Sequence, residues 1–330
     1  MTLKHVFAGI VCAAVTVLST PGATAAQPAA TAGVGLAQIA EPVAQADWPT
    51  RKAALQLYGE QFHTAADLYA ALRKQAKGGR KLTWGTIPDW SGVYARAISS
   101  LRYDLDQPSN DFDESKMPEL PTAKLTPEAR AKYIKQMQDA VSGKEYDAQL
   151  SACLPAGVPR WFTEPYLRDF AISPGQTWLM NELANETRRV YTDGRAHPKK
   201  EDQYPTFEGD SIGFWVGDKL VVHTNGLTEG NFQRREPEHT ADAELVEVWR
   251  KIDAATVVAD VWVFDPQVLA APWFTRQSYL KQDNADSSLR IGYYDCVGTP
   301  NTRVIKTQDG GTTFEDLNFD KSASGGKRKE

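Results

Sequence analysis

The sequence has few of the motifs that mark cofactor-dependent enzymes. It contains no glycine-rich loop that ends in Lys-Ser or Lys-Thr, no dinucleotide fingerprint, and no pair of histidines one helical turn apart. These absences argue against phosphate, nicotinamide and helix-borne metal sites. We therefore expect no metal and no cofactor.

Basic charge and long apolar runs are also scarce. The net charge is −5, and the one dense basic cluster is Lys327-Arg328-Lys329 at the C-terminus, so nucleic-acid binding is not expected. A membrane-spanning helix needs ~20 apolar residues, and no segment reaches that length, so we expect no integral membrane contact. These features leave the oligomeric state open.

Residues 1–26 predict a secretory signal peptide. Lys4 and His5 give a short positive start, residues 6–18 are apolar, and Ala23-Thr24-Ala25 provides the small residues at which a signal peptidase cleaves. A buried N-terminal core helix is the alternative. We expect export and a periplasmic location for the mature protein.

The chain contains only three cysteines, and their positions bear on export. Cys12 lies in the signal peptide and is expected to be removed with it. Cys153 and Cys296 remain, and in an oxidising compartment we expect them to form one disulfide, with two free thiols as the alternative. Neither lies beside another cysteine or in a histidine cluster, so a zinc site is not expected.

Composition divides the rest of the chain into regions. Residues 27–46 are rich in Ala, Pro and Gly and predict a flexible leader, whereas residues 47–82 have apolar residues at helical spacing. A β-barrel-like domain is expected over residues 84–306, with an inserted helix near 126–142. Residues 307–330 predict a disordered tail.

Short β-branched and aromatic runs, separated by turn residues, predict a sheet from Phe162 onward. They are residues 190–192, 211–215, 219–224, 245–249, 257–264 and 274–280. Tight turns such as Val216-Gly217-Asp218 join consecutive runs, which favours an antiparallel meander. The expected fold class is therefore mainly β: a meander closed into a barrel or a curved half-barrel, with an α-helical N-terminal region.

Four sequence blocks add a resemblance to this pattern. They are residues 88–94 (PDWSGVY), 153–160 (CLPAGVPR), 191–198 (YTDGRAHP) and 209–222 (GDSIGFWVGDKLVV). Together they resemble a large family of exported bacterial proteins, mainly uncharacterised, over Trp84 to about Val297. Members usually carry Gly-Phe where this chain has Gly226-Leu227, and Arg at Val248. The resemblance implies a lipocalin-like barrel and implies no particular reaction.

Tyr191, Asp193, Arg195 and His197 alternate along the third block. On an extended strand all four would face one side. We expect Arg195 to hold an anionic or phenolate group, and Tyr191 and Asp193 to orient the imidazole of His197, which moves a proton. Asp193-Gly194 is also a hairpin signal, so the alternative is a plain turn in which Asp193 bonds its own backbone.

Two other histidines are candidates. His239 lies in a loop near Glu236, Glu238 and Asp242, whose carboxylates can orient an imidazole. We expect His239 to be catalytic, with an incidental surface residue as the alternative. His223 lies within a strand run, where a structural role is favoured.

One string resembles the nucleophile elbow of a serine hydrolase. It is Gly209-Asp210-Ser211-Ile212-Gly213. An elbow requires a helix directly after the serine, whereas strand residues and a hairpin follow Ser211. A serine hydrolase is therefore not favoured.

Charged and aromatic residues within the strands provide candidate substrate contacts. The substrate-binding residues that we expect are Arg195, Trp215, Glu247, Trp249, Arg250 and Trp262. Those on the strands would line the barrel if they point inward. The alternative places Glu247 and Arg250 on the solvated side of the sheet and the tryptophans in its core.

These residues together predict an exported, cofactor-independent enzyme. We expect a lyase or isomerase that acts on a small aromatic or apolar molecule, with His197, His239, Asp193 and Tyr191 as catalytic residues. A non-catalytic periplasmic binding or carrier protein is the alternative, and an envelope scaffold is a third. Convergence of a histidine, a carboxylate and Arg195 would favour the enzyme, and a filled barrel would favour the scaffold.

Overall fold

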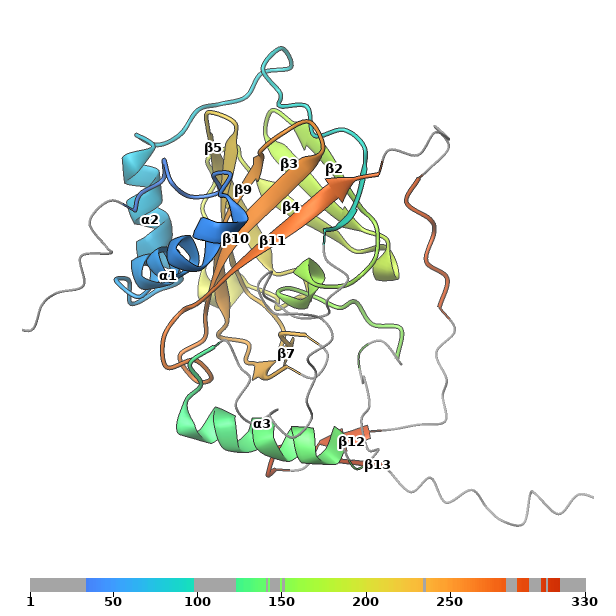
Figure 1. Ribbon diagram of the computed structural model, residues 1–330. Coiled ribbons are helices and arrows are strands. Elements are labelled where there is room, and N and C mark those ends of the chain that lie inside the picture. The colour runs from blue at the N-terminus through green and yellow to red at the C-terminus, as the bar shows by residue number, and fades with distance from the viewer. Residues whose placement is uncertain are drawn as a thin grey trace, which may run out of the picture.

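The protein is built around a closed β-barrel. The computed structural model describes residues 34–97, 123–140, 142, 149, 152–233, 236–282, 290–296, 304–306 and 308–314. Two helices lie against the outer side of the barrel and a third lies below its lower end, the end at which β5 and β9 begin (Figure 1). The helices are α1 (Trp48–Gly59), α2 (Ala65–Gln75) and α3 (Pro127–Asp139).

The barrel strands follow the order β1-β11-β10-β9-β6-β5-β4-β3-β2, and the pairing of β1 with β2 closes the circle. They are β1 (Val93–Arg96), β2 (Arg168–Ser173), β3 (Gln176–Asn181), β4 (Thr187–Tyr191), β5 (Asp210–Val216), β6 (Lys219–Asn225), β9 (Glu244–Lys251), β10 (Thr256–Phe264) and β11 (Trp273–Lys281). Two short pairs lie outside the barrel, β7 (Gly230–Asn231) with β8 (Glu238–His239), and β12 (Val304–Lys306) with β13 (Thr312–Phe314). The prediction of a mainly β, lipocalin-like barrel is confirmed.

One strand pair departs from the predicted antiparallel meander. β4 and β5 run parallel, with Val190 opposite Ser211 and Tyr191 opposite Ile212. Parallel neighbours need a connection of a dozen or more residues, and residues 192–209 provide it by returning to the lower end. The sheet is therefore mixed, and this long connection carries His197.

Aromatic rings pack against one another inside the barrel. The indole of Trp249 is stacked on Phe162 and on Tyr279, with ring centroids 5.8 Å apart in each pair. Phe170 contacts Trp249 at 5.8 Å and Tyr94 at 5.2 Å. All five side chains are buried, so the described interior is a packed core.

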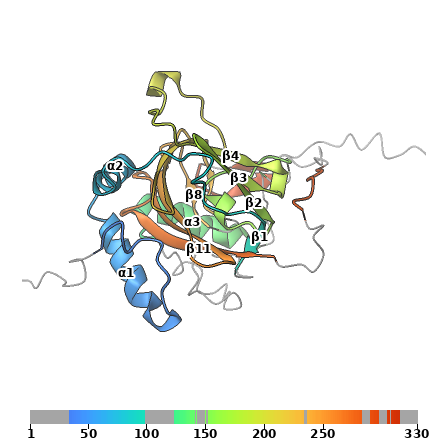
Figure 2. The same ribbon diagram turned by 90° about the horizontal axis from the view of Figure 1, so that it is seen from above.

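α1 and α2 cover the outer face of the barrel on one side, as the view from above shows (Figure 2). Thr64 caps α2, because its hydroxyl accepts a hydrogen bond from the Asp67 amide at 3.1 Å. Tyr69 of α2 packs on Phe214 of β5 at 5.4 Å, and the indole N–H of Trp262 on β10 donates to the Leu55 carbonyl of α1 at 2.9 Å. The N-terminal helices expected from the apolar spacing therefore bury a second core outside the barrel.

Residues 34–46, before α1, correct that part of the flexible leader predicted over residues 27–46, whereas residues 27–33 lie outside the described residues. Ile39 and Ala40 are fully buried against the barrel. The ammonium of Lys219 donates to the carbonyls of Leu36 at 2.8 Å and Ile39 at 2.7 Å, and the Ala40 amide donates to Asp260 at 2.7 Å. Local composition could not reveal this docking, because its partners lie about 180 residues or more further along the chain.

The predicted disulfide joins Cys153 to Cys296. Residues 290–296 are fastened beside it, because the Asn185 side chain donates to the Tyr294 carbonyl and accepts from the Tyr294 amide, both at 3.0 Å. The chain after the last barrel strand is thus tied back to the turn between β3 and β4.

Two predictions concern the ends of the chain: a signal peptide over residues 1–26 and a disordered tail over residues 307–330. The predicted signal peptide, residues 1–26, lies outside the described residues. The tail predicted to be disordered, residues 307–330, contains β13, which pairs with β12, so that prediction was wrong in part.

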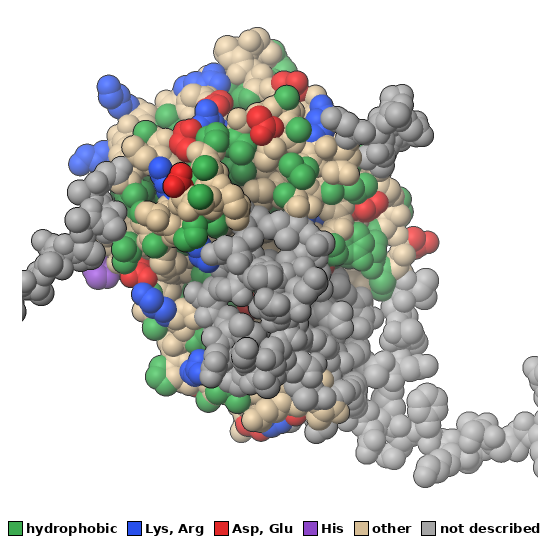
Figure 3. Space-filling view, viewed as in Figure 1, with side chains coloured by type: hydrophobic (Ala, Val, Ile, Leu, Met, Phe, Trp, Pro, Cys, Tyr) green, Lys and Arg blue, Asp and Glu red, His purple; other side chains and the backbone are tan. Residues whose placement is uncertain are grey.

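No helix among the described residues is long and apolar enough to cross a membrane. Acidic and basic side chains are interspersed over the upper part of the face in Figure 3.

The contact of α1 with the barrel is testable at Gly59. A Cβ added there would lie 2.3 Å from Cδ1 of Trp262. We expect Gly59→Ala to lower the free energy of unfolding by about 1–3 kcal/mol in a denaturant titration, because this overlap outweighs the gain in helix propensity. Gly85→Ala is the matched control, since nothing lies within 4 Å of its added Cβ. Equal stability of the two variants would contradict the close packing of α1.

Candidate functional site

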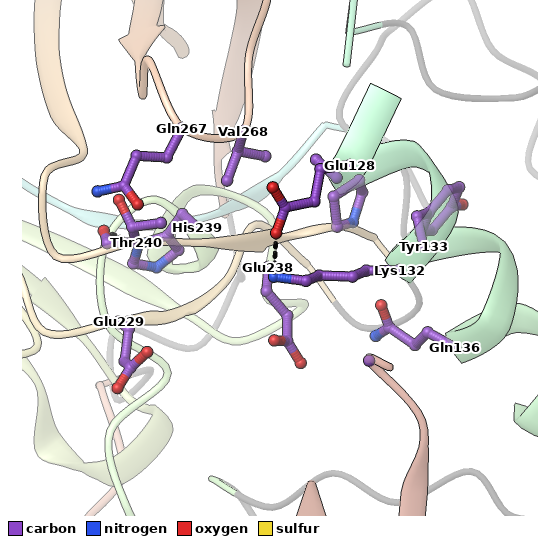
Figure 4. Close-up of a pocket in the computed structure, with 13 residues that line it drawn as sticks. Glu128, Lys132, Tyr133, Gln136, Glu229, Glu238, His239, Thr240, Gln267 and Val268 are labelled. Atoms are coloured by element: carbon purple, nitrogen blue, oxygen red, sulfur yellow. Dashed lines mark hydrogen bonds and ion pairs between the residues drawn. The ribbon is translucent and has the colours of Figure 1, made fainter. Parts of the chain in front are cut away.

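A pocket of about 360 Å³ lies at the lower end of the barrel, between α3 and the β7–β8 pair (Figure 4). We call it the lower pocket. It is lined by Glu128, Ala129, Lys132, Tyr133, Gln136, Glu229, Pro237, Glu238, His239, Thr240, Gln267, Val268 and Gly310. Its volume lies within the range of small-molecule sites.

His239 of β8 brings a predicted catalytic imidazole to this pocket. The ring is almost buried, with 5% of the residue exposed, and it contacts Phe232 at 5.6 Å between centroids. Nδ1 lies 3.1 Å from the Thr240 carbonyl oxygen, to which it can only donate. This hydrogen bond fixes the tautomer, so Nε2 is the unprotonated nitrogen of the neutral ring.

α3 supplies the opposite wall of the lower pocket. Its first turn is fixed by Thr126, whose hydroxyl caps the Ala129 amide at 3.3 Å, with Pro127 at the first helical position. Glu128 and Lys132 form an ion pair at 3.1 Å, seen as the dashed line in Figure 4. The Tyr133 ring adds an apolar surface on the same side.

Asp265 fastens the two loops that form the upper rim of the lower pocket. It accepts hydrogen bonds from the amide of Thr240 at 2.7 Å, from the Thr240 hydroxyl at 3.0 Å and from the Gln267 amide at 3.2 Å. Burial raises the pKa of this carboxyl, against hydrogen bonds that lower it. The rim residue Thr240, to which His239 donates, is therefore held in place by Asp265.

His197 lies elsewhere, in a row of four side chains on the outer face of the barrel. Asp210 accepts from Nδ1 of His197 at 2.5 Å, Nε2 of His197 lies 3.0 Å from Nδ1 of His223, and Nε2 of His223 lies 2.9 Å from Glu244. We call this row the two-histidine line. It joins the β4–β5 connection to β5, β6 and β9.

Tyr191, Asp193 and Arg195 do not join either histidine site. Asp193 and Arg195 form an exposed ion pair at 2.7 Å, and the Arg195 guanidinium lies over the Tyr191 ring at 4.0 Å. The Asp193 side chain also accepts a hydrogen bond from the Arg195 amide at 3.1 Å. Gly194, between them, has a φ of 93°, which is typical of a turn. This is the plain turn of the alternative interpretation, so the expected convergence of Arg195 with a histidine is not found.

Glu247 and Trp249 do point into the barrel, as expected for substrate contacts, but they bind each other and Arg188. Glu247 and Arg188 form an ion pair at 2.6 Å with no exposed side-chain surface. Glu247 also accepts from the Trp249 indole at 2.7 Å and from the Thr224 hydroxyl at 3.2 Å. Every carboxylate oxygen is thus satisfied within the core.

The remaining predicted substrate contacts are spread over different environments. Trp215 points inward and packs on Trp90 at 5.4 Å. Trp262 faces outward beneath α1, which corrects the expectation that it lines the barrel. Arg250 is paired with Asp218 at 2.9 Å and with Glu41 at 2.5 Å near the surface. These three residues do not share one site.

Glu186 is a buried carboxyl that the sequence did not single out, and the partly buried Glu208 acts on it through its charge. Burial raises the pKa of Glu186 to about 7, and the charge of Glu208 adds to this rise. The Gly157 amide at 2.7 Å and the Asn181 side chain at 2.6 Å donate to Glu186 and oppose the shift. Burial also raises the pKa of Glu208.

One of the residues that the sequence analysis missed, Arg188, could have been found from the sequence. Arg188 lies two residues before Val190, so an earlier start to that strand would have placed it on the same inward face. No local signal places α3 beside His239. Among the described residues, no three His, Cys, Asp or Glu side chains are arranged to hold a metal ion.

Comparisons with known proteins add no identification. No protein-family model matches the chain, and no curated protein matches it.

The ion pair inside the barrel gives a prediction on stability. Glu247→Gln leaves the buried Arg188 charge without its anion, and we expect a loss of about 3–5 kcal/mol in the free energy of unfolding. The double variant Arg188→Met/Glu247→Leu should recover most of that loss, because it removes both charges. Asp218→Asn, in an exposed pair, should change stability by less than about 1 kcal/mol. A small effect of Glu247→Gln, equal to that of Asp218→Asn, would refute the assignment.

Glu186 gives a prediction on pH. Its folded-state pKa of about 7 lies above the ordinary value of 4.5, so its contribution to stability is complete below pH 4.5 and is lost as the pH rises through 7. Glu186→Gln removes this loss. We expect its stability relative to wild type to improve by roughly 2–3 kcal/mol between pH 5 and pH 8. The exposed Glu201→Gln is the control, and an identical pH dependence in both variants would contradict the shift.

Proposed function

We propose that the protein is a cofactor-independent enzyme of the lyase or isomerase type, with His239 as its acid–base group in the lower pocket. The observation that carries the proposal is the hydrogen bond from Nδ1 of His239 to the Thr240 carbonyl, within a pocket of small-molecule size. A fixed tautomer lets Nε2 take a proton from a bound molecule and later return it.

The lining of the lower pocket supports a small, partly apolar substrate that carries a hydroxyl or amino group. Tyr133 and Val268 offer apolar surface, and the carboxylates of Glu128, Glu229 and Glu238 offer hydrogen-bond acceptors. An aromatic alcohol or amine combines these two features. This substrate class keeps the expected aromatic ligand but moves it from the barrel interior to its lower end.

Packing of the barrel interior bears on the alternatives. A carrier that holds its ligand inside the barrel is poorly supported, because aromatic rings and the Arg188–Glu247 pair occupy the interior. A binding protein could still use the lower pocket without turnover. The filled barrel and the separate position of Arg195 meet the condition set for an envelope scaffold. We prefer the enzyme because a scaffold would need neither the pocket nor an oriented imidazole.

We retain export to the periplasm, and membership of the resembling family of exported proteins, as part of the proposal. The disulfide between Cys153 and Cys296 supports an oxidising compartment. Detection of the mature protein in the periplasmic fraction, with residues 1–26 removed, is the expected result, and an intact N-terminus in the cytoplasm would contradict it.

A substrate screen with matched variants tests the function. Purified protein is incubated with pooled aromatic alcohols, aldehydes and amines, and products are sought by chromatography and mass spectrometry. We expect turnover that falls by about 10²–10⁴-fold in His239→Gln, since that is the usual contribution of an acid–base group. His63→Gln, on an exposed helix connection, is the control and should retain full activity.

The outcomes separate the alternatives. Suppose that ligands bind without forming any product, and that the order of their affinities is the same in wild type and in His239→Gln. This result would support the binding protein and reject the enzyme. Full turnover in His239→Gln with an unchanged melting temperature would reject His239 as the acid–base group.

A further inference from the structure

The two-histidine line has the geometry of a site for a cation. The two carboxylates occupy the outer nitrogens, with Asp210 on Nδ1 of His197 at 2.5 Å and Glu244 on Nε2 of His223 at 2.9 Å. Both outer nitrogens therefore carry protons, because a carboxylate oxygen only accepts. In two neutral rings, the inner nitrogens would then both present lone pairs to each other.

Two lone pairs at 3.0 Å repel unless a positive charge lies between them. A single proton shared by the rings meets this requirement. A metal ion meets it as well, since metal-binding histidines characteristically turn their second nitrogen toward a carboxylate. Two nitrogens bound to one ion at ~2.0–2.1 Å lie roughly 2.9–3.4 Å apart for the bond angles of octahedral and tetrahedral ions.

The placement of the rings agrees with convergence on one point. Their centroids are 4.8 Å apart and their planes are inclined at 78°. Rings joined end to end by a linear hydrogen bond of 3.0 Å would have centroids further apart, so the two rings meet at an angle.

The surroundings hold both rings in this orientation and leave a path to solvent. Tyr69 of α2 is stacked on His223 at 5.4 Å with an angle of 27°. His197 has 13% of its side chain exposed, and Asp210 and Glu244 have 30% and 35%. The charged groups nearby are Arg195, which acts on Asp210, and Arg73, which acts on Tyr69.

We propose that His197 and His223 bind one late first-row divalent ion, such as Zn²⁺, Ni²⁺ or Cu²⁺, with Asp210 and Glu244 as the residues that orient the rings. Imidazole nitrogens suit these ions better than Mg²⁺ or Ca²⁺. No third His, Cys, Asp or Glu among the described residues completes the set, so solvent fills the remaining positions. The site is separate from the lower pocket and does not rest on the proposed enzyme function.

No metal was expected from the sequence because it has no pair of histidines one helical turn apart. His197 and His223 are 26 residues apart, and neither lies on a helix. The site exists only because the β4–β5 connection folds back over β5 and β6. Binding would fasten that connection to the sheet.

Calorimetric titration of the untagged, full-length mature protein with ZnCl₂ and with NiCl₂ tests the site. We expect one ion per chain and a higher melting temperature with metal. His197→Gln and His223→Gln should each abolish these effects. Asp210→Asn should weaken binding by about 10–100-fold, as loss of an orienting carboxylate does.

His63→Gln and His239→Gln are the matched controls, since each removes one histidine outside the line, and both should bind metal as wild type does. The proposal fails if wild type shows no binding at millimolar metal, or if binding persists unchanged in either His197→Gln or His223→Gln. Binding that His239→Gln abolishes would place the ion in the lower pocket and would also overturn it.

Discussion

Alternation of side chains across one closed sheet is the constraint on which the rest of the structure depends. On β5, β6 and β9 the inward residues Ser211, Thr224 and Glu247 join the buried polar network with Arg188. The neighbouring outward residues Asp210, His223 and Glu244 build the two-histidine line. A shift of one residue in register would exchange the two sets and place His223 and the carboxylates of Asp210 and Glu244 in the aromatic core. The pairing of β1 with β2 closes the barrel and so leaves neither set on an open edge.

Packing inside the barrel explains why the candidate active site lies at its end. The large rings of Trp249, Phe162, Phe170 and Tyr279 fill the space that a ligand would need in an open barrel. Loops at the lower end do not have to fill the barrel interior. There Asp265 holds the rim through Thr240 and Gln267, while α3 closes the other side. The packed core and the lower pocket are thus separated along the barrel axis.

Runs of β-branched and aromatic residues between turns predicted much of the fold. The runs at 211–215, 219–224, 245–249, 257–264 and 274–280 lie within β5, β6, β9, β10 and β11, because each combines β-branched or aromatic residues with a clear turn. β2 and β3 were not predicted, since Arg168, Asp169, Gln176 and Asn181 interrupt their apolar residues. Arg168 is buried there only because Asn181 and nearby carbonyls accept its hydrogen bonds. Such partners cannot be read from a local pattern.

The candidate sites show the same division. Residue type singled out His197 and His239 from the sequence, since imidazole is the side chain suited to proton transfer near neutral pH. Which carboxylates and walls surround them depended on contacts between distant segments: α3 lies more than 90 residues before His239 in the chain, and Glu244 reaches the line from β9.

The sequence by itself determined strands β5, β6, β9, β10 and β11, the helices and the cysteine pair, because these follow from local spacing and from the chemistry of single residues. Only the tertiary structure decided that the barrel is filled, that β4 and β5 are parallel, and that the two histidines meet. Those features arise from pairing and packing between segments far apart in the chain, which local sequence does not encode.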